Sequence, residues 1–202
     1  MSSMAIIHDL TIELRNRIFA AMNSASGLSL DFTDMLNNIV LSPPTDEAES
    51  TTRMSLYLYH IGINNSLRNQ AKLASPNNTD SLLNNPLPIE LKYLVTPLSD
   101  EPNNQLMMGR LLQYIYDFPR IDSIDQQALG NSFGGASGYV RITPSLMTVE
   151  QLAQLWNAFK QPYRLALAFT VDIVAIDSAK AAEVNPRVAE LIASAGHKGR
   201  QS

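Results

Sequence analysis

The sequence Arg-Leu-Ala-Leu-Ala-Phe-Thr-Val-Asp-Ile-Val-Ala-Ile, at residues 164–176, is the longest β-strand candidate in the chain. Large apolar side chains alternate there with small or polar ones, which is the period-2 pattern of a strand. One face carries Leu165, Leu167, Phe169, Val171 and Ile173. The other face is small and polar, and it includes Thr170 and Asp172. We expect a helix or a second chain to approach this small face closely.

The segment just upstream predicts a strand followed by a helix. Residues 139–143 form a short strand candidate. Thr148 and Gln151 have the spacing of a capping box, in which the threonine caps the helix and the glutamine reaches back. Pro162 follows the expected end of this helix, where a proline cannot continue it.

Two more strands are predicted in the first half of the chain. Residues 53–64 have apolar or aromatic side chains on both faces, which is typical of a strand covered on both sides. Another subunit is one candidate for such a cover. Tyr57 and Tyr59 share one of these faces, and we expect His60 to be partly buried on the other. Residues 89–95 alternate more simply, with apolar side chains inward and charged ones outward.

Helical spacing of apolar residues predicts helices at 4–22 and 104–117. Polar segments at 65–88 and 120–138 are interpreted as long loops, the second rich in glycine. The fold class predicted is α+β: a single domain with a mostly antiparallel or mixed β-sheet and three main helices packed on it. This domain spans residues 1–177. Residues 178–202 form an Ala-rich, mildly basic C-terminal tail with a short helix predicted at 186–195.

Composition excludes several classes of protein and site. The 202 residues are 45% hydrophobic and include no cysteine, so disulfides, thiolate metal sites and a cysteine nucleophile are excluded. The net charge is −4, with about −6 on residues 1–177 and +2 on the tail, so nothing indicates a nucleic-acid partner. No apolar run predicts a membrane span, and no signal peptide is recognisable, so we expect synthesis in a cytoplasm.

No arrangement of residues predicts catalysis, a metal site or a cofactor. The three histidines lack ligand-spaced partners, and most close carboxylate pairs fall in polar loops, where acids are normally solvated. Asp172 is expected instead to pair with a basic residue on a neighbouring strand or subunit. The Gly-rich segment has no lysine placed as in a P-loop. The chain is therefore not expected to be an enzyme, and it is expected to need no cofactor.

Four sequence blocks carry a resemblance to a known family. They are the stretch from Ser55 to His60 followed by Asn64–Asn69, then Pro86–Thr96, then Leu106–Ile121, and finally Val140–Asp177 with its Pro162-Tyr163-Arg164-Leu165 step. In their order and spacing they resemble the cap or tail-terminator family of extracellular contractile injection systems, which are phage-tail-like particles that deliver proteins. The second block departs from the family pattern, because Leu87 separates two prolines that are usually adjacent.

This resemblance implies a structural protein rather than an enzyme. It implies a homo-oligomeric ring, hexameric in known systems, that ends and joins the inner tube and the contractile sheath at the baseplate-distal end. The implied partners are sheath and inner-tube subunits, with the tape-measure protein a further candidate, and no nucleic acid or membrane. The chain would be made in the cytoplasm and assembled into a phage-tail-like particle for extracellular release. A terminal strand edge would accept a sheath arm by strand addition.

Face alternation and charge asymmetry give the candidate interface. It consists of Tyr57, Tyr59, Arg164, Thr170 and Asp172, together with the tail residues Arg187, Lys198 and Arg200. Two alternative functions stay open from the residues alone. One is a cytoplasmic assembly chaperone, and the other is a small-molecule-binding or hydrolytic domain that uses the loop at 120–138 as a lid.

Overall fold

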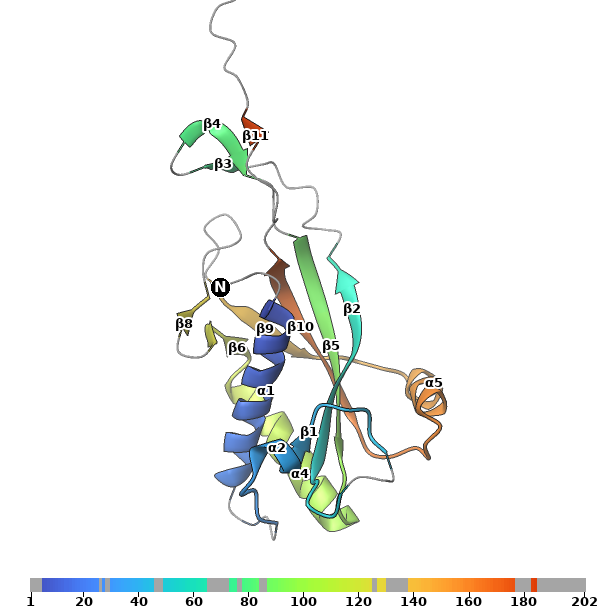
Figure 1. Ribbon diagram of the computed structural model, residues 1–202. Coiled ribbons are helices and arrows are strands. Elements are labelled where there is room, and N and C mark those ends of the chain that lie inside the picture. Colours follow the sequence, from blue (N-terminus) through green and yellow to red (C-terminus); the bar gives the residue numbers. More distant parts are fainter. Residues whose placement is uncertain are drawn as a thin grey trace, which may run out of the picture.

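The computed structural model describes residues 5–25, 27, 30–45, 49–64, 73–75, 78–83, 87–124, 127–129, 138–176 and 183–184. Its centre is a six-stranded mixed sheet in the order β1-β2-β5-β10-β9-β6 (Figure 1). These strands are β1 (Ile39–Val40), β2 (Met54–Ile63), β5 (Leu87–Pro97), β6 (Arg120–Ile121), β9 (Val140–Pro144) and β10 (Leu167–Ile176). Only β1 and β2 run parallel. The predicted α+β fold with a mixed sheet is confirmed.

Strand β5 is the middle of the sheet. It pairs antiparallel with β2 from Met54↔Pro97 to Ile63↔Ile89, and with β10 from Leu167↔Val95 to Ile176↔Leu87. The predicted alternation holds, because Leu91, Tyr93 and Val95 are fully buried while Glu90 and Lys92 are not. Leu94 and Thr96, on the same face as Glu90 and Lys92, are also fully buried. The middle strand is therefore covered on one face along the core and on the other face near its C-terminal end.

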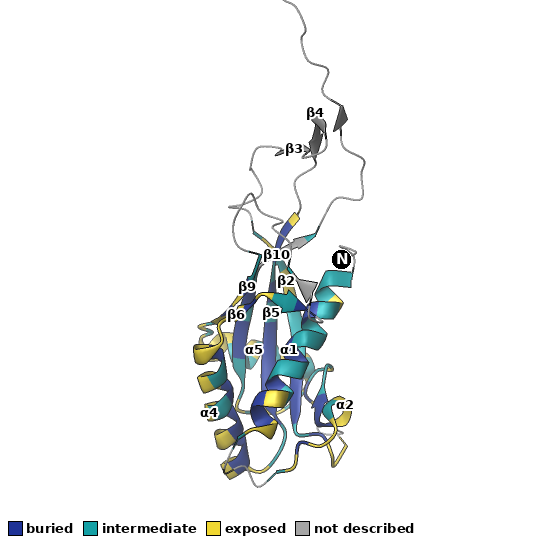
Figure 2. Cartoon of the chain, turned by 90° about the vertical axis from the view of Figure 1, so that its left-hand side faces the viewer, coloured by how far each residue is buried: buried dark blue, intermediate teal, exposed yellow. Residues whose placement is uncertain are grey.

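Helix α1 (Ile6–Asn23) covers the buried face of the sheet. Leu10, Leu14 and Ile18, at helical spacing, enter the same core cluster as Leu91 and Phe169. Helix α4 (Glu101–Asp117) adds an apolar stripe to this core, consisting of Met107, Leu111 and Ile115. Figure 2 shows α1 and α4 together on this side of the sheet.

A polar contact fixes α1 over the middle strand. The Thr11 hydroxyl donates to the Ile7 carbonyl at 2.7 Å, so the Tyr93 hydroxyl must donate to Thr11 Oγ1 at 2.8 Å. Burial raises the pKa of Tyr93 to about 12, against a smaller lowering by the bond with Thr11. The Tyr93 ring also stacks on Phe169 of β10, with the centroids 5.4 Å apart. This aromatic pair joins two strands and one helix.

Helix α5 (Val149–Phe159) lies on the opposite side of the sheet from α1 and α4 (Figure 1). The predicted capping box is confirmed, since Thr148 accepts from the Gln151 N–H and the Gln151 side chain accepts from the Thr148 N–H. A fourth helix, α2 (Met35–Asn38), is a single turn that the sequence did not predict. Its N-cap is Asp34, whose side chain accepts from two backbone N–H groups.

The predicted loops contain short strands. The segment 65–88, predicted as a loop, holds β3 (Leu73–Ser75) and β4 (Asn78–Leu83). The tail supplies β11 (Glu183–Val184), which pairs with β4 to complete a three-stranded sheet. The segment 120–138 contains β6, β7 (Ser123–Ile124) and β8 (Gln127–Ala128). The helix predicted at 186–195 lies outside the described residues.

Two further differences have local physical causes. Helix α4 begins at Glu101 rather than at the predicted residue 104, because Pro102 is tolerated in the first turn, where its missing N–H would have no partner in the helix. A β-bulge between Leu58 and His60 brings His60 opposite Lys92. His60 is therefore exposed on the face opposite α1, rather than partly buried with Leu56 and Leu58.

Candidate functional site

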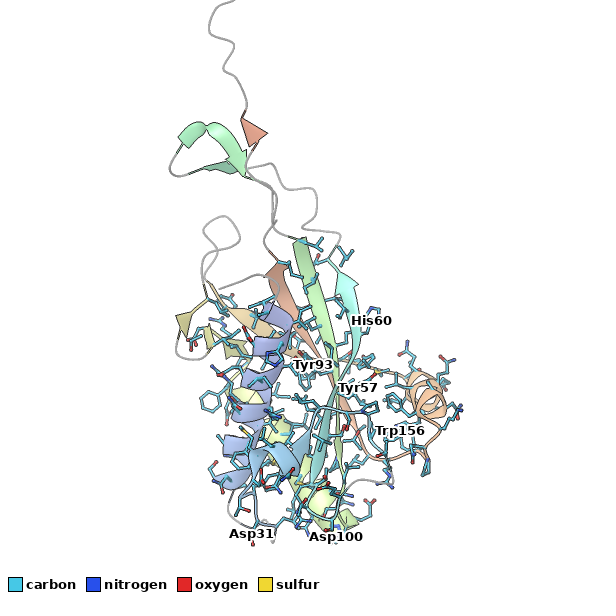
Figure 3. All side chains as sticks on the ribbon, in the orientation of Figure 1. Asp31, Tyr57, His60, Tyr93, Asp100 and Trp156 are labelled. Atoms are coloured by element: carbon cyan, nitrogen blue, oxygen red, sulfur yellow. The ribbon has the colours of Figure 1, made fainter. Side chains whose placement is uncertain are left out.

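The candidate interface lies on the face of the six-stranded sheet opposite α1, called here the outer face. Tyr57 of β2 belongs to it because its ring contacts Phe159 of α5, and Tyr59 belongs to it because its hydroxyl bonds Met147 just before α5. Thr170 and Asp172 of β10 alternate with the core residues Phe169 and Val171, and they pair with Lys92 and Arg141. The structure therefore places these four predicted residues on one face. Figure 3 shows Tyr57 and Trp156 on the α5 side of the sheet and Tyr93 on the α1 side.

An aromatic cluster occupies the part of the outer face beneath α5. The Tyr57 and Phe159 rings pack edge to face with their centroids 5.6 Å apart, and the centroids of Phe159 and Trp156 are 5.9 Å apart. The ring of Tyr163, which follows the helix, packs on Trp156 with a centroid distance of 6.3 Å. Such edge-to-face pairs add stability beyond burial alone. Tyr57 therefore holds α5 on the sheet of its own chain.

Tyr59 connects this cluster to the loop that precedes α5. Its hydroxyl donates to Met147 Sδ at 3.6 Å. Burial and the nearby negative charge of Glu90 both raise the pKa of Tyr59, so its hydroxyl remains a protonated donor across the ordinary pH range.

Charged side chains occupy the middle of the outer face. Lys92 Nζ lies 3.3 Å from Glu90 Oε1, and Lys92 is the register partner of both His60 and Thr170. A Cβ added at Gly62 would lie only 2.6 Å from Glu90 Oε1, so the glycine leaves room for this carboxylate. The sequence pattern predicts Glu90 and Lys92 on the outward side of their strand, but it contains no signal that connects them with Thr170. Only the strand register brings these residues together.

Asp172 lies opposite Arg141 of β9, on the neighbouring strand where a basic partner was expected. Burial raises the pKa of the Asp172 carboxyl, and the negative charge of Glu90 raises it further. Arg141 and Lys92 act in the opposite direction but do not outweigh these effects. Removing the Asp172 charge should therefore relieve an unfavourable interaction at neutral pH.

The remaining predicted interface residues lie elsewhere. Arg164 follows α5 in the segment that leads into β10, and it is half-buried. Arg187, Lys198 and Arg200 lie outside the described residues, as does the Gly-rich part of the proposed lid, 130–137. Within the described part of the chain, no three metal-ligating side chains gather into a site. Nor does any helix in that part have the length and apolarity needed to cross a membrane.

Comparison of the sequence with models of protein families gives one match over most of the chain. The model of the Pvc16 N-terminal domain matches residues 9–190. The chain belongs to the Pvc16 N-terminal domain family. This confirms the resemblance inferred from the four sequence blocks. The match includes β11 and so continues into the segment that sequence analysis treated as a tail.

Two solved structures share the fold of this Pvc16 N-terminal domain. One is a sheath/tube terminator of the extracellular contractile injection system PVC in its extended state, at 18% identity and a TM-score of 0.57. The other is the tube-terminating cap of the anti-feeding prophage, at 17% identity and a TM-score of 0.53. The matches cover 95% and 89% of this chain, but only 65% and 59% of those chains. No curated protein sequence matches significantly.

We expect Asp172→Asn to stabilise this domain in a pH-dependent way. A carboxyl whose pKa is raised by folding destabilises the folded state once it ionises. The variant should therefore have a higher melting temperature than the wild type at about pH 7, and the same melting temperature at about pH 3. Thermal unfolding at both pH values measures this. Asp31→Asn, at an exposed position outside the sheet, is the matched control. A lower melting temperature for Asp172→Asn at neutral pH would show that the attraction of Arg141 and Lys92 dominates.

Proposed function

We propose that the chain is the tail-terminator or cap of a contractile injection system. It forms a ring, a hexamer in our proposal, that ends and joins the inner tube and the contractile sheath at the baseplate-distal end. The observation that carries this is the family match over residues 9–190, together with the shared fold of two proteins described as a sheath/tube terminator and a tube-terminating cap. The role is structural, with no catalytic step.

The partners in this proposal are further copies of the chain, sheath subunits and inner-tube subunits, with the tape-measure protein as a further candidate. Synthesis takes place in the cytoplasm, and the ring becomes part of a phage-tail-like particle. The outer-face residues Tyr59, Thr170 and Asp172, and Arg164 in the segment between α5 and β10, contribute to contacts with a neighbour. Arg187, Lys198 and Arg200 extend this contact from the tail.

An unpaired strand edge supports a contact with the sheath. Among the described residues, β1 pairs only with Met54 and Ser55, so the outer edge of β2 from Leu56 to Ile63 has no neighbouring strand. Ile61 and Ile63 on this strand are about half exposed, at 50% and 51%. An open apolar edge is where an extended segment from another chain adds by backbone hydrogen bonds. We assign this edge to an arm of the sheath.

Light scattering on the purified chain, alone and with its sheath and tube proteins, tests the proposed function. A closed ring, either by itself or on addition of the partners, is the expected result. A monomer that ignores both partners would refute the terminator role. A chain that binds sheath subunits but is absent from purified mature particles would instead be an assembly chaperone.

The sheath contact makes a separate prediction. Ile61→Lys together with Ile63→Lys should abolish sheath binding, because charged side chains on an exposed edge prevent strand addition. The monomer should change in stability by no more than about 1 kcal/mol, since both side chains are half exposed. Leu36→Lys, at an exposed position on α2, is the control. Co-sedimentation with sheath subunits measures the effect, and binding unchanged from wild type would remove β2 from the contact.

A further inference from the structure

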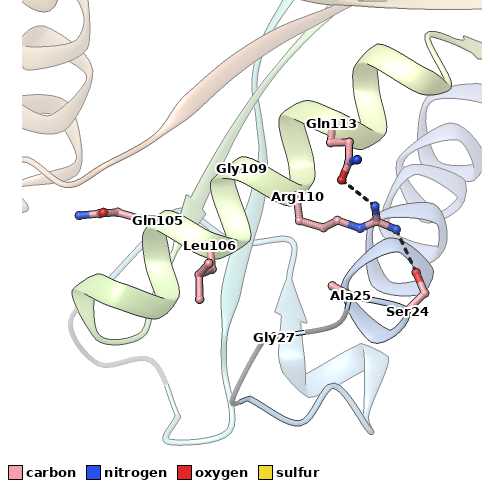
Figure 4. Close-up of a pocket in the computed structure, with 8 residues that line it drawn as sticks. All are labelled: Ser24, Ala25, Gly27, Gln105, Leu106, Gly109, Arg110 and Gln113. Atoms are coloured by element: carbon pink, nitrogen blue, oxygen red, sulfur yellow. Dashed lines mark hydrogen bonds between the residues drawn. The ribbon is translucent and has the colours of Figure 1, made fainter.

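A groove of about 480 Å³ lies between the end of α1 and the exposed side of α4 (Figure 4). We call it the α1/α4 groove. Its lining includes Ser24, Ala25 and Gly27, which follow α1, and Leu106, Gly109 and Arg110 of α4. Leu106 is half exposed here, so the groove offers an apolar side chain next to a cation. Neither the sheath contact nor the outer-face contact of the proposed function uses this groove.

Arg110 is held in a fixed position within the groove. Its Nε donates to the Ala21 carbonyl at 3.0 Å. Its Nη2 donates to Ser24 Oγ at 3.2 Å and its Nη1 to Gln113 Oε1 at 2.9 Å, as Figure 4 shows. All three acceptors are neutral. Within the described residues no carboxylate forms an ion pair with Arg110, and three of its five N–H groups are used. The groove thus presents a preorganised positive charge that can still bind an anion.

Gly109 leaves the exposed side of α4 open to close approach by another chain. A glycine inside a helix lowers stability relative to alanine. A Cβ built at Gly109 meets no heavy atom within 4 Å outside the adjoining backbone of its own helix. Crowding within the chain therefore does not require a glycine at position 109. Close approach of a partner chain to α4 would require one.

The opposite side of the molecule carries a corner of matching chemistry. At the start of α5, Leu146 is 99% exposed and Val149 is 70% exposed. Glu150 is exposed beside them, and hydrogen bonds from its own backbone N–H and from Thr148 lower the pKa of its carboxyl. We call these three residues the α5 corner. It combines two uncovered apolar side chains with a stable negative charge, which complements Leu106 and Arg110.

The corner and the groove of one chain cannot meet each other. Helices α1 and α4 cover one face of the sheet, and α5 lies on the other (Figure 1). Two different complementary surfaces on opposite sides of one chain produce head-to-tail association, which closes into a ring when the rotation between copies permits it. We propose that the α5 corner of each copy docks into the α1/α4 groove of the next, with Glu150 paired to Arg110. This inference rests on the ring in the proposed function and specifies its interface.

A charge exchange tests the pairing. Arg110→Glu and Glu150→Arg should each weaken self-association at least tenfold, and the double variant should recover most of it, as measured by light scattering. Leu146→Glu should weaken association to a similar degree. The matched controls are Glu101→Arg on α4 and Leu36→Glu on α2, both exposed and outside the two surfaces. Because Arg110→Glu removes bonds at the end of α1, melting of each monomer identifies a folding defect, and the variants at Glu150 and Leu146 decide the outcome in that case.

Disulfide trapping gives a second readout that also detects transient contacts. The chain has no cysteine, so Leu106→Cys and Leu146→Cys can be introduced in separate copies and mixed under oxidising conditions. A crosslinked dimer of the two variants is expected, and Leu36→Cys with Leu106→Cys should give none.

The possible results separate the two proposals. If the wild type assembles, but no crosslink forms and the charge-exchange variants assemble normally, the groove interface is overturned and the proposed ring remains. Variants that still self-associate but lose binding to tube or sheath assign the groove to that partner and overturn self-docking. Wild type that never assembles, with or without sheath and tube, and never crosslinks refutes the ring together with this interface.

Discussion

Trp156→Ala is expected to destabilise the protein by about 3 kcal/mol and to release α5 from the sheet. Trp156 is only 2% exposed and contacts both Phe159 and Tyr163, while Phe159 connects the helix to Tyr57 of β2. Truncating a buried tryptophan removes the apolar area and leaves a cavity. The buried Nε1 makes no hydrogen bond among the described residues, so its removal offsets part of the loss. The net cost should therefore lie toward the lower end of the usual range.

Chemical denaturation followed by circular dichroism measures the stability, and amide exchange measures whether α5 opens separately. Trp156→Phe is an informative partner variant, because it keeps an aromatic ring and removes the unpaired N–H; it should cost clearly less than Trp156→Ala. Val149→Ala, at an exposed position on the same helix, is the control and should stay within about 0.5 kcal/mol of wild type. A loss below about 1 kcal/mol for Trp156→Ala would mean that other contacts hold α5.

The long elements could be predicted from sequence because each carries its own local pattern. Helix α1 shows its buried stripe in the spacing of Leu10, Leu14 and Ile18, and β5 shows its two faces by simple alternation. The capping box at Thr148 identified the start of α5 to the residue. These signals depend only on neighbours in the chain, so no knowledge of the fold was needed to find them.

The short strands could not be predicted because their cause is distant in sequence. Strand β11 pairs with β4, which lies about a hundred residues earlier in the chain. Neither segment has an apolar run or alternation that would predict a strand. The bulges in β2 and β10 also lack a sequence signal, and the one in β2 changes which side chains share a face. His60 is exposed for this reason, although its parity in the strand matches that of the buried Leu56.

The candidate site also has a part that the sequence could predict and a part that only the tertiary structure determines. Alternation alone grouped Tyr57 with Tyr59 within β2 and Thr170 with Asp172 within β10, because these are long strands. The pairing of both strands with β5 determines that the two groups share one face. Their different environments follow from tertiary structure. Tyr57 is taken up by α5, whereas Asp172 meets Arg141 through the register with β9. Sequence therefore grouped the residues within each strand, while the strand register and the helix placement determine which groups share a face and what each residue contacts.

Leu10→Ala is expected to cost about 3 kcal/mol, within the range of about 2–5 kcal/mol for truncating a buried leucine. Leu10 is fully buried, and Thr11, which binds the Tyr93 hydroxyl, follows it directly in α1. The helix cannot move inward to fill the cavity without disturbing this hydrogen bond, so we expect little relaxation at the site. Leu10 differs in this respect from a buried residue near a helix end, where the chain can collapse more easily.

The control for this prediction is His8→Ala, two residues earlier, whose side chain is largely exposed; it should change stability by no more than about 0.5 kcal/mol. Denaturant midpoints of both variants measure the difference. Because α1 packs on the face of the sheet opposite α5, the losses from Leu10→Ala and Trp156→Ala should add in a double variant, as they do for sites without shared partners. A combined loss well below the sum would show that the two layers unfold as coupled units through the sheet between them.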